Sequence, residues 1–166
     1  MITKIGSNSL FMINSHVGHD CQIGNNTIIA NNVALAGHCI INDYVVIGGN
    51  SAALQFTNIG VGSMIGGMTG VDKDILPYSL IKGNRCYYEN LNLIGLKRKG
   101  FSNKEIEEYK RIVLNIFKTD NLKNYIHDIK GDSVLIKSLK DFIKNKNPNR
   151  DTVSYTHLRA HETLSY

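Results

Sequence analysis

Large aliphatic residues recur at every sixth position through the first half of the chain. From Ile5, twelve six-residue blocks run to Leu76 without an insertion. The first position of each block is nearly always aliphatic, the fifth is mostly small or β-branched, and Gly, Asn and Asp gather at positions two to four. Gly and Asn tolerate the backbone conformations of tight corners. The pattern therefore predicts very short strands, joined by corners and stacked as a parallel solenoid.

An α-helix does not explain this repeat, because six is not a helical period and so many Gly and Asn residues disfavour a helix. The pattern resembles the hexapeptide-repeat transferases, which implies left-handed, triangular coils of three blocks each. Residues 5–76 would then form four coils, and residues eighteen apart would stack. Cys21 would lie over Cys39 as two small interior residues rather than as a disulfide or metal site.

After Pro77 the pattern changes to one typical of helices. Ser102 and Glu105 form the capping box S-x-x-E, and apolar residues follow at helical spacing. Further helices are expected over about 121–130 and 133–144, the first of them closed by a glycine. We expect these helices to pack on the solenoid or on each other across an oligomer.

Three segments are predicted from these patterns. The left-handed β-helix is assigned to residues 1–83 and a small α-helical domain to residues 84–150. Residues 151–166 continue neither pattern, and SYTHLRAHET resembles a translated sequencing adapter. We therefore expect 151–166 to be a non-native tail.

Charge separates the two predicted domains. The formal net charge is +5, yet residues 1–81 hold two basic and four acidic residues, whereas residues 82–150 hold sixteen basic and eight acidic ones. A basic segment suits an acidic partner, an anionic membrane or nucleic acid. Nucleic acid is disfavoured, because no aromatic residues are interleaved as a stacking platform.

The remaining composition favours a cytoplasmic protein. No apolar run approaches the length of a membrane span, and the first residues lack the pattern of a secretory signal. Three Cys residues do not make a disulfide framework.

Histidines inside the repeat carry the candidate chemistry. His19 is followed at once by Asp20, so the carboxylate can orient a ring that acts as a base near neutral pH. One coil later, Gly37 precedes His38, and a glycine there can bring a backbone N–H close to a reacting carbonyl. Asp20 should stack over His38. The arrangement suits base-assisted acyl transfer.

Two other interpretations of these histidines are open from the residues alone. His16, His19 and His38 could form a three-histidine zinc site, although His16 and His19 lie only three residues apart in one coil. Alternatively, the histidines lie at solenoid corners without any chemical role. We expect a base and no metal.

Longer segments carry a more specific resemblance. FMINSHVGHDCQIGNNTIIANNVALAGH, IGGMTGV, PYSLIKGN and NLIGLKRKGFS closely resemble the UDP-N-acetylglucosamine 3-O-acyltransferase family, which starts lipid A synthesis. The resemblance covers about residues 2–145. It implies transfer of a 3-hydroxyacyl group from acyl carrier protein to the glucosamine 3-hydroxyl of UDP-N-acetylglucosamine, with the carrier thioester as donor and no cofactor.

The same resemblance assigns roles to individual residues. His19 matches the general base, Asp20 the residue that orients it, and Gly37 the backbone oxyanion donor. Gly67 falls where the family sets acyl length, and its lack of a side chain would favour a longer chain. The other implied substrate contacts are His16, His38 and Gln55 along the sugar and acyl site, and Asn92 and Arg98 at the nucleotide.

Some positions depart from the family pattern. Ile94 stands where some members carry an acidic nucleotide contact, Arg85 where some carry His, and Leu54 where His is frequent. Family chains also begin with further coils, so Met1 is expected to be an internal start or a contig edge, and the chain an N-terminally truncated fragment.

The resemblance also implies partners. A homotrimer is expected, with the site between neighbouring chains. The basic helical segment would steer the acidic carrier protein, through Lys97, Arg98, Lys99, Lys104, Lys110 and Arg111. Three alternatives remain: a related N-acyltransferase of the same pathway, an acetyltransferase that uses coenzyme A, and a non-catalytic solenoid scaffold.

Overall fold

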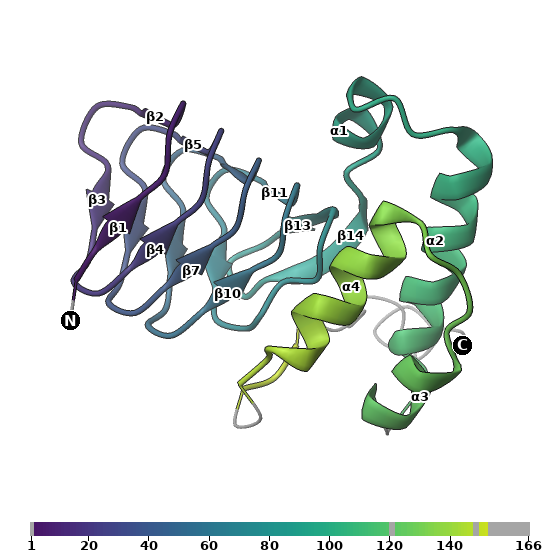
Figure 1. Cartoon of the computed structure of the whole chain (residues 1–166). Coiled ribbons are helices and arrows are strands. Elements are labelled where there is room, and N and C mark those ends of the chain that lie inside the picture. Colours follow the sequence, from purple (N-terminus) through teal and green to yellow (C-terminus); the bar gives the residue numbers. More distant parts are fainter. Residues whose placement is uncertain (1, 120–121, 148–149, 153–166) are drawn as a thin grey trace, which may run out of the picture.

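The computed structural model describes residues 2–119, 122–147 and 150–152. Its first part is a solenoid of twelve strands, each two residues long. Figure 1 shows them stacked in order from the N-terminus toward the helices. Their bounds are β1 Lys4–Ile5, β2 Leu10–Phe11, β3 His16–Val17, β4 Gln22–Ile23, β5 Ile28–Ile29, β6 Ala34–Leu35, β7 Ile40–Ile41, β8 Val46–Ile47, β9 Ala52–Ala53, β10 Asn58–Ile59, β11 Met64–Ile65 and β12 Gly70–Val71.

The strands form three parallel sheets, one for each side of the coil. Their orders are β1-β4-β7-β10, β2-β5-β8-β11 and β3-β6-β9-β12, so every third strand is a neighbour. Each strand residue pairs with the residue eighteen positions later, as Ile5 does with Ile23 and Ile23 with Ile41. The prediction of three blocks per coil and of stacking at eighteen-residue spacing is confirmed.

The fourth residue of a block turns the corner with a left-handed backbone. Asn8, Asn14 and Asn26 have φ values of 57°, 59° and 56°, which Asn tolerates better than most residues. Asp20 and His38 take the same conformation, with φ of 59° and 61°. The backbone N–H at this position donates to a carbonyl of the coil before, so each corner carries a ladder of hydrogen bonds along the solenoid axis.

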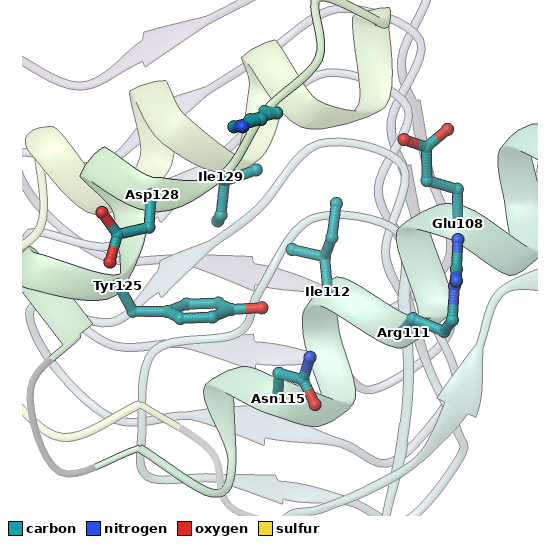
Figure 2. Close-up of a pocket in the computed structure, with 8 residues that line it drawn as sticks. Glu108, Arg111, Ile112, Asn115, Tyr125, Asp128 and Ile129 are labelled. Atoms are coloured by element: carbon teal, nitrogen blue, oxygen red, sulfur yellow. The ribbon is translucent and has the colours of Figure 1, made fainter.

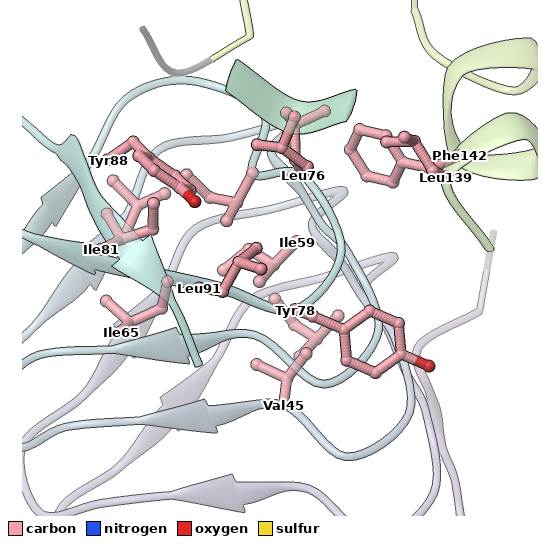
Figure 3. Packing of buried hydrophobic residues seen from close by; sticks show 14 of the residues in the cluster. Val45, Ile59, Ile65, Leu76, Tyr78, Ile81, Tyr88, Leu91, Leu139 and Phe142 are labelled. Carbon is pink, nitrogen blue, oxygen red and sulfur yellow. The ribbon is translucent and has the colours of Figure 1, made fainter. Parts of the chain in front are cut away.

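The interior of the solenoid is filled by the first and fifth residues of the blocks. Ile41 and Ile59 are 1% and 0% exposed, and burial of such a side chain stabilises the fold by about 1.5–3 kcal/mol. Cys21 and Cys39 are buried free thiols, as predicted. Figure 3 shows the core continuing from solenoid residues such as Ile59 to Phe142 of the helical end.

A β-hairpin lies between Pro77 and the helices, and its second strand falls within residues 84–150, the segment predicted to be helical. β13 Ser79–Lys82 pairs parallel with β11, and β14 Tyr87–Leu91 pairs antiparallel with β13. Gly83, with φ of 101°, lies in the turn. Open backbone groups on β11 favour another strand there, although the six-residue repeat has ended.

Four helices complete the described chain, and Figure 1 shows them at the end of the solenoid away from the N-terminus. They are α1 Leu93–Arg98, α2 Asn103–Ile116, α3 Leu122–Asp128 and α4 Val134–Lys144. The capping box of Ser102 and Glu105 at α2 is confirmed. Helix α1 was not expected, and residue 121 of the second expected helix lies outside the described residues. None of the described helices is long and apolar enough to span a membrane.

The helical part is fastened to the solenoid by polar as well as apolar contacts. The buried Tyr109 hydroxyl donates to the Pro77 carbonyl at 2.9 Å. The Tyr78 ring meets the Tyr109 ring edge-on, with ring centres 6.1 Å apart. Farther along, the Asp74 N–H donates to the carbonyl of Asp151, and Thr152 forms a bridge with Asp74. Residues 151–152 of the predicted tail thus contact the solenoid, and 153–166 lie outside the described residues.

Candidate active site

His19 and Asp20 form a hydrogen-bonded pair at a solenoid corner that follows β3. The distance from His19 Nδ1 to Asp20 Oδ2 is 2.9 Å. Asp20 itself has the left-handed backbone of the corner, with φ of 59°. When the Nδ1–H donates to the carboxylate, the Nε2 atom keeps its lone pair and can accept a proton. The His19 side chain is 75% exposed, so a substrate hydroxyl can reach it.

Two rings continue this corner on the next coils. His38 stacks one coil above Asp20, as predicted, and its Nε2 lies 3.9 Å from Asp20 Oδ2. The His38 ring meets His19 edge-on at 4.9 Å and lies nearly parallel to the Phe56 ring at 4.6 Å. Phe56 therefore holds the His38 ring beside the His19–Asp20 pair. The sequence signal for Phe56 was its place eighteen residues after His38.

Gly37 lies directly under the His19 ring. A Cβ atom at Gly37 would come within 2.6 Å of His19 Nε2 and 2.7 Å of Cε1, so any larger residue would displace the ring. No hydrogen bond of the Gly37 N–H to another described residue is present. An unpaired N–H beside a base is the geometry required of an oxyanion donor.

The other predicted site residues fall into two groups. Gln55 shares the corner of His19 and Gly37, because it follows Gly37 by eighteen residues. His16, by contrast, points outward from β3 and pairs in register with Ala34. Gly67 belongs to another corner, the one after β11, where it stacks on Gly49.

Asn92 and Arg98 belong to helix α1, which is fastened at the third corner. Asn92 caps α1 by accepting from the Gly95 N–H, and its Nδ2 donates to the Gly62 carbonyl at 2.9 Å. Lys99 Nζ lies 3.0 Å from the centre of the Tyr44 ring on the same corner. Loss of hydration lowers the pKa of Lys99, against the opposing effect of Asp43. One chain therefore does not bring Asn92 or Arg98 to His19.

The candidate metal ligands form a smaller group than a three-histidine site requires. Among the described residues, the one group of three whose ligand atoms lie within 4.8 Å of one another is His19, Asp20 and His38, without His16. The 2.9 Å contact in this group, between His19 Nδ1 and Asp20 Oδ2, is an ordinary hydrogen-bond distance. The geometry favours a base over a zinc ligand set.

A separate hollow of about 280 Å³ lies between α2 and α3. Figure 2 shows the Tyr125 ring pointing from α3 toward Ile112 and Asn115 of α2. Its charged lining is mixed, with Glu108 and Asp128 beside Arg111 and Lys130. It contains none of the residues predicted to be catalytic.

Two family models match the chain. One, described as UDP-N-acetylglucosamine O-acyltransferase domain 2, matches residues 74–153. The other, the bacterial transferase hexapeptide with six repeats, matches residues 2–37. Together they cover the start of the solenoid and the whole helical part.

Curated relatives carry the same family name. An acyl-[acyl-carrier-protein]–UDP-N-acetylglucosamine O-acyltransferase from Paracoccus denitrificans is 47% identical over 105 residues, which are 63% of this chain and 40% of the relative. One from Anaeromyxobacter sp. strain K is 46% identical over 118 residues, 71% of this chain and 46% of the relative. The chain thus spans less than half the length of these relatives.

Solved structures agree with the fold. UDP-N-acetylglucosamine acyltransferase from Campylobacter jejuni superposes with a TM-score of 0.82 at 35% identity, over 91% of this chain and 60% of that one. The enzyme from Moraxella catarrhalis gives a TM-score of 0.84 at 34% identity, with the same coverage. The fold is the left-handed parallel β-helix of the hexapeptide-repeat transferases, followed by a small helical region. Within that class, the chain belongs to the UDP-N-acetylglucosamine O-acyltransferase family.

Proposed function

We propose that this chain transfers a 3-hydroxyacyl group from acyl carrier protein to the glucosamine 3-hydroxyl of UDP-N-acetylglucosamine. One observation carries the proposal. His19 is oriented by Asp20 at 2.9 Å, and its Nε2 lies over Gly37, whose N–H makes no hydrogen bond to another described residue. A base and an oxyanion donor therefore lie side by side, and the relatives named for this reaction share both fold and sequence.

The proposed chemistry uses only groups of the chain and the two substrates. His19 Nε2 takes the proton from the 3-hydroxyl while that oxygen attacks the thioester carbonyl. The Gly37 N–H stabilises the negative charge that forms on the carbonyl oxygen. The C–S bond then breaks, and the proton passes from His19 to the departing thiol of the carrier. Asp20 stabilises the protonated ring between the two steps. No cofactor takes part.

Binding of the substrates is proposed to involve more than one chain. His19, His38 and Gln55 lie on one corner, Gly67 on a second, and Asn92 is fastened to a third. Because no single corner holds all these groups, we propose a homotrimer in which a neighbouring chain supplies the nucleotide contacts Asn92 and Arg98. His16 and Gln55 would line the sugar and acyl site, and Gly67, which has no side chain, would leave room for a longer acyl chain.

The carrier protein is proposed to dock near α1 and α2. An acidic partner is favoured because these helices expose several cations, including Lys97, Lys104 and Arg111. Lys99 is the exception, since its ammonium group is engaged with the Tyr44 ring.

The test is acyl transfer by the purified chain from 3-hydroxyacyl carrier protein to UDP-N-acetylglucosamine. Product is expected from the wild-type chain. His19→Ala should lower kcat by about 10²–10⁴-fold, the usual contribution of a general base. Lys137→Gln, an exposed change on α4, serves as the matched control and should act like wild type.

Other results would contradict the proposal. Absence of product from the wild-type chain would show that this chain does not catalyse the reaction. Equal rates from wild type and His19→Ala would remove His19 as the base, and acylation with acetyl coenzyme A as the preferred donor would favour an acetyltransferase. The cytoplasmic location stays a prediction, which fractionation of cells producing the tagged chain would test.

A further inference from the structure

The corner that carries the candidate base has a ladder of backbone hydrogen bonds. The His38 N–H donates to the His19 carbonyl at 2.9 Å, and the Phe56 N–H donates to the Gly37 carbonyl at 3.1 Å. The repeat would supply the next donor from residue 74, eighteen positions after Phe56. The Asp74 N–H instead donates to the Asp151 carbonyl, so the Gln55 carbonyl needs another donor.

Arg150 supplies that donor from the far end of the described chain. Its Nη1 donates to the Gln55 carbonyl at 3.0 Å. The peptide between Gln55 and Phe56 is thus held on both sides, by Gly37 and by Arg150. The other bonds of the guanidinium group go to Asp74 Oδ1 at 3.1 Å, Thr57 Oγ1 at 3.1 Å and the Asp72 carbonyl at 3.0 Å.

Arg150 thus joins the Gln55 carbonyl to the Asp74 carboxylate, and this clamp is strong because it is buried. The Asp74 side chain is 1% exposed and the Arg150 side chain 14% exposed, so water screens little of the attraction between their charges. Asp74 Oδ1 also accepts from the Asn58 N–H, and its Oδ2 has no partner within the described residues. Removing one member of a buried ion pair leaves the other charge uncompensated.

We propose that Arg150 is a positioning residue of the active site, a role that rests on the proposed acyl transfer. Its hydrogen bond fixes the Gln55–Phe56 peptide. That peptide holds the Gly37 carbonyl, and thereby the backbone next to the oxyanion donor. The same peptide sets the position of the Phe56 ring, which lies 4.6 Å from the His38 ring. Arg150 touches neither substrate nor reacting atoms in this role.

Arg150→Gln is the variant that tests the role, in the full chain beside wild type and Lys137→Gln. Glutamine keeps a polar amide, but it loses the charge and the fork of guanidinium N–H donors that bonds Gln55 and Asp74 at the same time. We expect kcat to fall about 10-fold while KM for UDP-N-acetylglucosamine changes less than about 3-fold, because small displacements of aligned groups cost rate more than binding. Arg150→Lys should recover part of kcat, since it restores the charge but not the fork.

A second readout does not depend on turnover. The ring-proton NMR signals of His38 report the position of the stacked Phe56 ring, and Arg150→Gln should shift them, whereas Lys137→Gln should not. If Arg150→Gln does not fold, Asp74→Asn weakens the same clamp while keeping the acceptor for Asn58, and the same changes are expected.

Unchanged kcat and unchanged His38 signals in a folded but less stable variant would overturn the proposal, leaving Arg150 as an end cap of the solenoid. If wild type itself forms no product, the proposed function fails. The His38 signals then decide by themselves whether Arg150 positions this corner.

Discussion

At the scale of single residues, the proposed site is marked by the close approach of His19 to Gly37. The space that a side chain would take at Gly37 is occupied by the imidazole ring. The pair His19–Asp20 was predictable from the sequence, because adjacent residues at a known corner must lie together. The engagement of Arg150 was not, because its partner Gln55 lies 95 residues earlier in the chain.

Gly37→Ala should abolish most activity without unfolding the chain. The new Cβ would lie 2.6 Å from His19 Nε2, so the exposed ring must swing away from the Gly37 N–H, the proposed oxyanion donor. We expect kcat to fall about 100-fold and the melting temperature to stay nearly constant. The measurements are steady-state acyl transfer and thermal unfolding.

Gly49→Ala is the matched control, since Gly49 holds the same block position on another corner. Its Cβ would lie 3.2 Å from the Asn31 carbonyl and touch no histidine. A large loss of kcat in this variant, or none in Gly37→Ala, would contradict the assigned geometry.

The buried Cys39 thiol should make the fold less stable at alkaline pH. Burial, with a smaller contribution from Cys21, raises the pKa of the Cys39 thiol from 9.0 to about 12. A raised thiol pKa stabilises the fold fully below pH 9, and this contribution is lost as the pH rises toward 12, because the unfolded chain ionises first.

Cys39→Ser isolates this effect. Serine occupies the same block position at Ser51 and Ser63, does not titrate, and can still donate to the Leu54 carbonyl as the thiol does. The difference in free energy of unfolding between wild type and Cys39→Ser should shift against wild type by a few kcal/mol between pH 9 and 12. Parallel pH curves from chemical denaturation would rule out this account.

At the scale of elements, the strands were predictable and the connection to the helices was not. A six-residue period fixes which residues face inward, and therefore also which of the twelve solenoid strands lie side by side. The hairpin of β13 and β14 depends on the open edge of β11, and no local sequence pattern predicts that edge. Helix α1 has six residues and no acidic residue in its first turn, so its sequence signal is weak.

Tyr109→Phe should loosen the attachment of α2 to the solenoid. The variant leaves the Pro77 carbonyl without its buried donor, which costs about 1–3 kcal/mol. The free energy of unfolding from urea titration is the measurement. Tyr44→Phe, at an exposed tyrosine, should change it by less than about 0.5 kcal/mol. Equal effects of the two changes would argue against the Pro77 contact.

At the scale of the whole molecule, the three corners of the solenoid carry different parts of the proposed site. Family resemblance predicted both His19 and Arg98, but only the folded chain reveals that they belong to different corners. A closed ring of chains related by rotation would place one corner of a chain beside another corner of its neighbour.

Mixed oligomers test this arrangement. His19→Ala and Arg98→Ala should each be inactive alone. When the two chains are refolded together in equal amounts, about a quarter of the interfaces combine an intact His19 with an intact Arg98, so about a quarter of wild-type activity should return. Acyl transfer by the mixture is the measurement. A mixture as inactive as its components would place both residues in a site within one chain.

The uninterrupted repeat fixes the distance along the solenoid between the candidate base and the helical end. Each eighteen-residue coil adds one strand spacing, about 4.8 Å, to the distance between the base and the helical end. Inserting or deleting a whole coil would preserve every inward-facing position beyond it, whereas a single added residue would turn all later aliphatic side chains out of the core. The distance along the solenoid from His19 to the helices can therefore change only in whole coils.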